Sequence, residues 1–411
     1  MKNAEHKLTD STEANPTAEN YLNKAQIAHL EKAQSLTEVV YNQFKEHKAA
    51  VIGFYTIIVF IVVALSAPLI EKVSGLDPDA QNVFNRYKPP FSRIQASSDA
   101  KESAIKAFIT ENPTEASEIQ SQLISNNRVN PVRPEDALYD WAQLDRTKAL
   151  AAINQLAIPK KSELTKMIKS FETLHLLGTD ELGRDVVMRL IYGTRVSMGV
   201  GILVALASTL IGLIIGALAG FYGGWIDTAL MRVTDALLSL PILPVLIVVA
   251  AIDLQKIPFL SSIISSGNES ILKLVFILCI FSWMTVARLV RGSILSLRER
   301  EFVLAAKTLG AKDSTIIFRH MFPNVIAPML VSVTLGVGES ILSEAALSYL
   351  GLGIQPPTPS WGNMLFNAQE LIYQAPYLAI IPGVLIFIVT ISFNFLGDGL
   401  QDAIDPKAIR R

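Results

Sequence analysis

Long charge-free stretches alternate with polar segments along this 411-residue chain. The first, 49–70, has no charged residue over 22 positions, enough for the ~20 residues that a helix needs to cross a bilayer. Because it follows 48 mostly polar residues, it starts too late for a cleaved signal peptide. Charge-free stretches follow at 196–226, 236–252 and 371–397. Two more apolar stretches carry few charges: 321–343 holds only Glu339, and 271–290 holds Lys273 and Arg288 near its ends. The pattern predicts six spans. Five remain possible, because 236–252 has only 17 residues.

Lys and Arg residues in the flanking segments set the expected orientation. The segment 1–48 holds six Lys, residues 288–320 hold seven Lys or Arg, and the tail 400–411 adds three more. With six spans these basic segments share one side, whereas 347–370 on the other side has none. Both termini are therefore expected in the cytoplasm. A five-span chain would separate the termini, against the distribution of charge.

The composition agrees with a membrane protein. Half of the residues are hydrophobic and 18% are charged, below the ~25% charged residues of soluble domains. A net charge of −1 gives no indication of a nucleic-acid partner. The single cysteine, Cys279, falls within a span and is interpreted as a packing residue, and no metal-ligand spacing occurs. The expected fold class is all-α, a polytopic helical bundle.

The loop 71–177 is long enough to fold by itself as an external insert. Several short amphipathic segments separated by prolines predict a small helical subdomain, with Trp141, Leu144 and Leu150 in its core. A flexible spacer is the alternative. In the N-terminal segment, 17–47 has a helical pattern and 1–16 is expected to be disordered.

Small residues recur along the second span. Ser208, Gly212, Gly216 and Gly220 are four residues apart and share one helix face, which allows another helix to approach closely. Pro241 and Pro244 in the third span and Pro382 in the sixth predict kinks.

The segment 301–324 predicts a short amphipathic helix, a break, and a second short helix before Pro323. One stripe of mostly small residues runs along the first helix; its members are Phe302, Ala305, Ala306, Leu309 and Gly310. Such a helix between two spans fits either docking to a partner outside the bilayer or contact with lipid headgroups.

Several charged residues suggest local pairs. The four-residue spacing predicts the ion pairs Asp180–Arg184 and Asp185–Arg189, which are interpreted as structural. A local Arg232–Asp235 pair is expected in the second cytoplasmic loop.

An ionisable residue lies inside the fifth span. Glu339 is costly there, because such groups usually face a bundle interior or a wet cavity. It is a candidate pathway residue that could contact a peptide amino terminus, and a hydrogen-bonded carboxyl at a helix interface is the alternative. Glu344, nearer the external face, is interpreted as a packing or capping residue.

From about residue 175 onward the chain resembles the dipeptide/oligopeptide/nickel permease family of ABC importers, in particular its C-type subunit. Five segments carry the resemblance, among them the cytoplasmic loop signature EFVLAAKTLGAKDSTIIFRHMFPN. The others are LGTDELGRDVVMRLIYGTR at 177–195, GFYGGWIDTALMRVTDALLSLP at 220–241, SEAALSYLGLGIQPPTPSWGNM at 343–364 and NFLGDGLQDAIDPK at 394–407.

This resemblance implies a type I importer permease fold, with a first span at 49–70 and a core domain at 178–399 holding five spans. It further implies a helix at about 299–313 that couples the core to an ATPase. The coupling residues carried over are Glu301, Leu304, Ala305, Ala306, Gly310 and Pro323. Leu304 occupies the usually acidic first position of the signature, so the contact is expected to depend on the small residues rather than on an acid.

The resemblance also implies the partners and the substrate. They are a second, B-type permease, two cytosolic ATP-binding subunits that bind ATP and Mg²⁺, and a periplasmic substrate-binding protein, all at the inner membrane of a bacterium. The expected cargo is a di- or oligopeptide, with nickel chelates or another small solute as the alternative. No cofactor is expected in this chain, since it contains no G-x-x-x-x-G-K-[ST] phosphate loop.

Two other functional classes find little support. A membrane-embedded enzyme needs nucleophiles and bases clustered within spans, but the five His residues fall outside them and neither H-E-x-x-H nor G-x-S-x-G occurs. No catalytic residue is therefore assigned. An ion-coupled secondary transporter is expected to show inverted repeats and paired intramembrane charges, and neither is evident.

Overall fold

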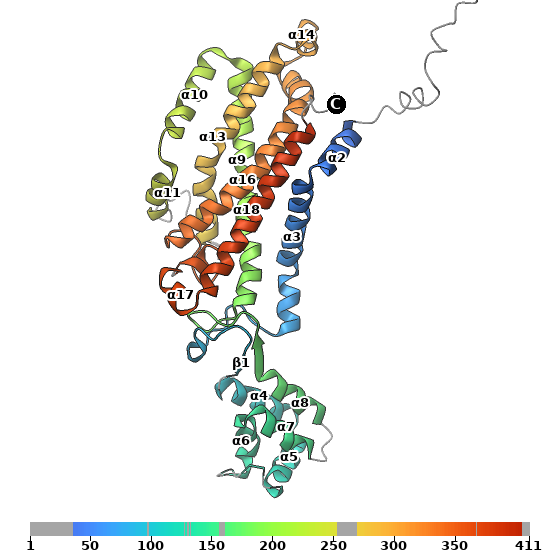
Figure 1. The fold of residues 1–411 in the computed structure, drawn as a ribbon, viewed down its shortest axis with the longest axis vertical. Helices are drawn as coiled ribbons and strands as arrows, with labels where there is room; N and C mark the ends of the chain where they lie inside the picture. The colour runs from blue at the N-terminus through green and yellow to red at the C-terminus, as the bar shows by residue number, and fades with distance from the viewer. Residues whose placement is uncertain are drawn as a thin grey trace, which may run out of the picture.

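The computed structural model describes residues 36–404 except 97, 127, 130, 132, 156–160, 253–268 and 367. In these residues the protein is a helical bundle with a small helical insert at one end (Figure 1). Of the predicted helix at 17–47, the described part forms α2 (Leu36–Glu46). The polar segment 1–16 lies outside the described residues.

Five helices of the described residues are long and apolar enough to cross a membrane. They lie side by side and form the bundle (Figure 1). These are α3 (Lys48–Ser74), α9 (Val186–Tyr222), α13 (Glu269–Arg298), α16 (Phe322–Tyr349) and α18 (Tyr377–Ile404). A sixth span results if α10 (Gly224–Leu238) and α11 (Ile242–Ala251) count as one, although the two are bent by 87°.

The third span expected at 236–252 is broken at Pro241, one of the two prolines at which a kink is predicted. The chain breaks between Leu238 and Ile242, where Pro241 is the N-cap residue of α11. Proline lacks the amide hydrogen that would continue a helix, and it pushes the preceding residue toward extended backbone. The sixth predicted span also divides, into α17 (Ala368–Gln374) and α18, at the segment that contains Pro376.

The helix α9 is the centre of the bundle, because it contacts α3, α13 and α16 along its 37 residues. It begins ten residues before the predicted start at 196. The charges of Arg189 and Arg195 had concealed this first part of the helix from the sequence pattern. Arg189 is buried there beside Asp180, so its charge is compatible with the helix.

The insert is joined to the bundle by a two-stranded antiparallel ladder of β1 (Ser92–Gln95) and β2 (Glu172–His175). Between these strands, the described residues form five helices and a 3-10 turn around a separate apolar core. They are α4 (Ser98–Glu111), α5 (Pro113–Ser125), η3 (Pro134–Asp136), α6 (Ala137–Gln143), α7 (Arg146–Asn154) and α8 (Lys161–Ser170). Trp141 is fully buried and donates from Nε1 to the Ala149 carbonyl at 3.0 Å, and Leu144 and Leu150 pack at the edge of this core.

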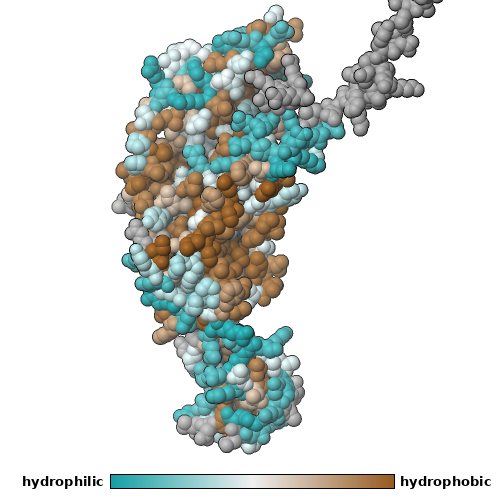
Figure 2. Space-filling model, viewed as in Figure 1, coloured by the Kyte–Doolittle hydropathy of each residue, from teal (hydrophilic) through white to brown (hydrophobic). Residues whose placement is uncertain are grey.

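The opposite end of the bundle carries α2, the end of α18 and a group of short elements (Figure 1). These are α14 (Glu301–Thr308), α15 (Asp313–Thr315) and the π-helix η5 (Ile316–Met321), which leads into α16. The described residues also form the 3-10 turns η2 (Val83–Asn85) and η6 (Asn363–Leu365). On the face shown in Figure 2, hydrophobic residues gather along the middle of the bundle, whereas both ends and the insert are mostly hydrophilic.

Candidate functional site

The short helix α14 lies at the end of the bundle away from the insert, held on one side by the bundle itself (Figure 1). Val303 and Ala306 are buried in an apolar cluster with residues of α13, η5 and α16. The opposite side keeps large apolar side chains exposed, with Phe302 at 44%, Leu304 at 50% and Leu309 at 87% of their full exposure. An exposed apolar face of this kind on a short helix is suited to docking.

The predicted stripe of α14 is thus divided between two sides of the helix. Ala306 is 9% exposed and faces the bundle, whereas Phe302, Ala305 and Leu309 are exposed. The helix is also shorter than the expected 299–313, since it ends at Thr308. Glu301 begins it and is exposed.

Gly310 ends α14 by its backbone conformation. Its φ is +77°, in the left-handed region, and a Cβ at this position would meet no atom within 4 Å. The following amide, of Ala311, returns to the Ala306 carbonyl at 3.1 Å, as in a helix C-terminal motif. Glycine is therefore favoured here for the turn rather than for space. Pro323 lies exposed at the start of α16.

Two ion pairs tie α10 to α13 on the same half of the molecule. Arg291 Nη2 donates to Asp227 Oδ2 at 2.6 Å, and Arg288 pairs with Asp235. The expected local pair of Asp235 with Arg232 is wrong, because Asp235 reaches across to α13 instead.

The small residues of α9 lie against α13. A Cβ added to Gly212 would lie 2.6 Å from the Cβ of Val286, and one added to Gly220 would lie 2.9 Å from the Cβ of Ile294. Gly216, between them, faces Ala287 and Val290. Ser208 is buried and bonds the Ala205 carbonyl of its own helix.

At the insert end, buried charges surround the start of α9. Asp180 pairs with Arg184 at 2.7 Å, as the spacing predicts, and also with Arg189 at 3.3 Å. The predicted Asp185–Arg189 pair is wrong, because Asp185 caps α9 by accepting from the Met188 amide and binds His175 Nδ1 at 2.7 Å.

Sequence comparisons identify the bundle. Residues 212–410 match the model of the family described as binding-protein-dependent transport system inner membrane component, and residues 35–90 match the N-terminal TM domain of oligopeptide transport permease C. The dipeptide transport system permease protein DppC of Alkalihalophilus pseudofirmus is 40% identical over 233 residues, which cover 57% of this chain and 72% of that protein. The glutathione transport system permease proteins GsiD of Pectobacterium atrosepticum and Escherichia coli are 42% and 40% identical over 57% of this chain, and over 73% and 72% of their own lengths.

The chain belongs to the binding-protein-dependent transport permease family. It is a multi-pass membrane protein and a permease subunit of an ABC importer, as its resemblance had indicated.

In this permease the candidate pathway residue Glu339 is exposed on the surface of the isolated chain. Leu335 and Leu342, on the same side of α16, are exposed as well. The adjacent Gly338 faces α18, where Asn394 Oδ1 lies 3.5 Å from the position that a Cβ would take. A carboxylate within a span is unfavourable against lipid, so this side of α16 is suited to a partner or to water.

The interpretation of Glu344 in the permease as a simple packing or capping residue missed its main contacts. Its carboxylate is fully buried and accepts hydrogen bonds from Ser197, Ser348 and Ser360 at 3.0, 2.7 and 2.9 Å. The four-residue spacing of Glu344 and Ser348 could have suggested one of these bonds. The other two cross between distant segments and leave no local signal.

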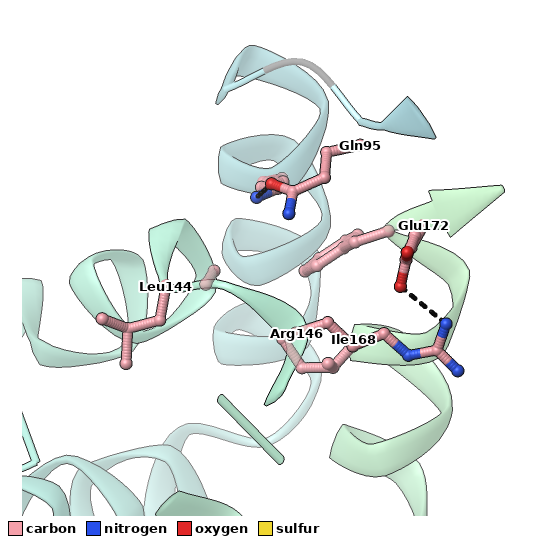
Figure 3. A pocket seen from close by; sticks show the side chains of 8 residues that line it. Gln95, Leu144, Arg146, Ile168 and Glu172 are labelled. Carbon is pink, nitrogen blue, oxygen red and sulfur yellow. Dashed lines mark hydrogen bonds and ion pairs between the residues drawn. The ribbon is translucent and has the colours of Figure 1, made fainter. Parts of the chain in front are cut away.

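No cluster of three or more potential metal ligands occurs among the described residues of the permease. In the insert, a small cavity of about 10 Å³ lies between β1, α4, α7 and β2 (Figure 3). Arg146 and Glu172 form an ion pair of 2.6 Å across its edge. The cavity has room for no more than about one water molecule, so it is not a substrate site.

A larger cavity lies at the loop that follows α16, at the insert end of the bundle. Its volume is about 220 Å³. The loop supplies most of its lining, and the rest comes from Glu181, Ser348 and Leu371. The loop residues include Ile354, Gln355, Pro356, Asn363 and Phe366.

Proposed function

We propose that this permease forms, with a second B-type permease, the pathway by which an ABC importer moves di- or oligopeptides across the inner membrane. The functions of its relatives carry the proposal, since these are transport proteins for dipeptides or for glutathione, itself a tripeptide. Nickel chelates and other small solutes are the alternative cargo. A periplasmic substrate-binding protein delivers the cargo, and two cytosolic ATP-binding subunits bind Mg-ATP and hydrolyse it.

The cargo is tested by reconstituting the transporter with its binding protein. Uptake of a labelled dipeptide or oligopeptide should depend on ATP and on the binding protein. Free nickel or a nickel chelate should not be taken up and should not inhibit uptake of the peptide. Nickel-dependent uptake without peptide uptake would overturn the peptide assignment.

The exposed side of α14 supports docking of an ATP-binding subunit. Phe302 and Leu309 are exposed, while Val303 and Ala306 pack against α13 and α16 and hold the helix there. A movement of the ATPase against α14 therefore acts directly on two spans. The coupling role extends to Glu301, Leu304, Ala305 and Gly310, and to Pro323 at the head of α16.

Ala305 gives the sharpest test of this contact. It is exposed and helical, so Ala305→Trp should leave the permease folded but obstruct the ATPase groove, lowering coupled uptake at least tenfold. Leu304→Glu should be tolerated, because it restores the usual acidic position of the signature. Gly310 with a bulky side chain should also uncouple ATP hydrolysis from uptake, but its left-handed turn would be strained as well. Normal uptake by Ala305→Trp would contradict the docking.

The exposed Glu339 supports a pathway along α16 and α18. A carboxylate on this side is accommodated if the second permease or a water-filled pathway covers it. Glu339→Gln should reduce uptake without impairing assembly. Glu370→Gln, which neutralises a carboxylate outside the span, is the matched control and should transport normally. Unchanged uptake by Glu339→Gln would remove this residue from the pathway.

The distribution of Lys and Arg supports cytoplasmic termini, with α14 on the same side and the insert in the periplasm. Cys279 is buried, so replacing it with Ser allows single reporter cysteines elsewhere. A membrane-impermeant maleimide should label Glu118→Cys in the insert in intact cells, but Lys307→Cys in α14 only after lysis. The reverse pattern would invert the topology.

We also propose that the insert is an external helical cap near the pathway entrance. The residues paired in its ladder allow a clean deletion, since Gln95 lies opposite Glu172. Replacing 96–171 by Asn-Gly should close the strands as a tight hairpin and leave the bundle intact. If the insert is a cap, uptake or docking of the binding protein should fall. Unchanged uptake and docking would show it to be a spacer.

A further inference from the structure

The loop between α16 and η6 folds back into the external end of the bundle. It has no regular secondary structure from residue 352 to 360. Nevertheless Ile354, Ser360 and Trp361 are each at most 2% exposed. Gly362 lies so close to α16 that a Cβ there would be 2.6 Å from the Ala345 Cα. A buried loop must find hydrogen-bond partners for its backbone outside any helix or sheet.

Three backbone amides of this loop donate to serine hydroxyls. The Ile354 amide donates to Ser348 Oγ at 3.1 Å, and the Trp361 amide donates to Ser197 Oγ at 3.1 Å. The Asn363 amide donates to Ser360 Oγ at 3.0 Å. The three serines belong to α16, α9 and the loop itself, so the loop is fastened to both helices.

All three serines in turn donate to Glu344. A serine hydroxyl has one proton. Since each oxygen already accepts a loop amide, that proton points at the Glu344 carboxylate. The Glu344 carboxylate accepts all three of these protons, so one side chain fixes the direction of all three hydroxyls. The chain of contacts runs from one carboxylate through three hydroxyls to three loop amides.

The fastened loop forms the wall of two external cavities. Its residues line most of the cavity of about 220 Å³ described above. Residues from Gly351 to Thr358 also line a second cavity, of about 520 Å³, whose other wall includes Glu269 and Lys273. A shift of the loop therefore changes the shape of both.

We propose that Glu344 is the positioning residue of the external loop 351–366, which it holds through Ser197, Ser348 and Ser360 so that the loop forms the wall of the external cavities. The substrate does not touch Glu344, which is fully buried. The positioning does not depend on the identity of the cargo.

Hydrogen exchange of the assembled transporter, read by mass spectrometry, tests the positioning. Glu344→Gln retains the shape of the side chain, but its amide nitrogen donates where the serines need an acceptor. Loop amides 354, 361 and 363 should exchange roughly tenfold to a hundredfold faster, as expected when a buried hydrogen bond is lost. The exchange rates of the insert amides should not change, because the insert has its own core.

Single serine variants sharpen the test and apply even if Glu344→Gln does not fold. Ser348→Ala should mainly speed up exchange of the amide of residue 354. In the same way, Ser197→Ala should mainly affect the amide of residue 361, and Ser360→Ala the amide of residue 363. Ser392→Ala is the matched control, because Ser392 is also buried in a span but bonds only the Ile388 carbonyl of its own helix. Exchange of all three amides at the control rate in these variants would overturn the proposal.

A double-mutant cycle separates positioning from a general structural effect. If Glu344 acts through Ser360, adding Ser360→Ala to Glu344→Gln should change loop exchange and the uptake rate by less than about twofold beyond the single variant. Ser392→Ala added to Glu344→Gln should have the same effect as it has alone. Full additivity of the Glu344 and Ser360 effects would show that the two residues act independently and would refute the relay. A wrong peptide assignment would leave the exchange results untouched.

Discussion

The rings of Phe60 and Trp361 pack edge to face, with centroids 5.8 Å apart and planes at 82°. Phe60 belongs to the first span, α3, and Trp361 to the loop between α16 and η6. The indole is fully buried, and its Nε1 donates to the Leu190 carbonyl of α9 at 3.3 Å. One side chain of the loop thus contacts both the first span and the central helix.

Trp361→Ala should destabilise the permease by about 3–5 kcal/mol, the usual cost of removing a buried aromatic side chain. Trp361→Phe retains most of the packing and loses the indole hydrogen bond, so about 1 kcal/mol is expected. Thermal unfolding in detergent, followed by size-exclusion chromatography, measures both. Equal effects of the two variants would show that packing against Phe60 contributes little.

The contact of α9 with α13 should not tolerate added volume. Gly212→Val places atoms against Val286 and the Trp283 carbonyl, and the helices must separate to admit them. Overpacking of this kind costs about 1–3 kcal/mol or more. Gly199→Ala is the control in the same helix, since its Cβ would meet nothing within 4 Å. Alanine also stabilises the interior of a helix by up to about 1 kcal/mol relative to glycine.

The same thermal measurement decides this prediction. Gly212→Val should lower the unfolding temperature, and Gly199→Ala should leave it unchanged or raise it. If Gly212→Val unfolds at the wild-type temperature, then the helices are not packed as closely as the structure indicates.

The Asp227–Arg291 pair should couple α10 to α13 more strongly than Asp235–Arg288. The Asp227 carboxylate is 16% exposed, whereas both side chains of the second pair are 53% exposed. Double-mutant cycles with Asn and Gln substitutions should give about 1 kcal/mol for the first pair and close to zero for the second. Equal coupling energies in the two cycles would contradict this ranking.

The spanning helices could be predicted because a long apolar stretch has few other uses. Their ends were harder to find, because they depend on contacts between distant residues. Arg189 reads in the sequence as the polar flank of a span, yet Asp180 compensates its charge inside the start of α9. A break such as the one at Pro241 is visible in the sequence, but its 87° bend is not.

The helix α14 could be located from local spacing and from the resemblance, but the side that it turns to the bundle could not. Ala305 and Ala306 are neighbours on one predicted stripe, and only contacts with α13 and η5 decide that Ala306 faces inward. The contacts of Glu344 could not be predicted from the sequence either, because its partner Ser197 is 147 residues away.

The buried Lys101 should make the stability of the insert increase with pH. Its side chain is only 4% exposed, and the ammonium donates to Gln95 Oε1 at 3.3 Å. Burial lowers the pKa of Lys101 from its usual value of 10.5, and Asp145 opposes the shift in part. The unfolded chain therefore binds more protons between the lowered pKa and 10.5, so the insert should become more stable as the pH rises through this window.

Lys101→Met should remove this dependence, because it replaces a buried ammonium by an apolar side chain of similar length. Lys106→Met is the matched control, since Lys106 is exposed on the same helix and should leave the dependence intact. Pulse proteolysis of the insert in urea, on the full chain at about pH 8 and about pH 10, gives the stability of each variant. At the lower pH the Lys101→Met variant should be as stable as the wild type or more stable, and the difference should shrink at the higher pH. A stability gap that widens with pH would show that the ammonium stabilises the insert through Gln95 and Asp145 by more than its burial costs.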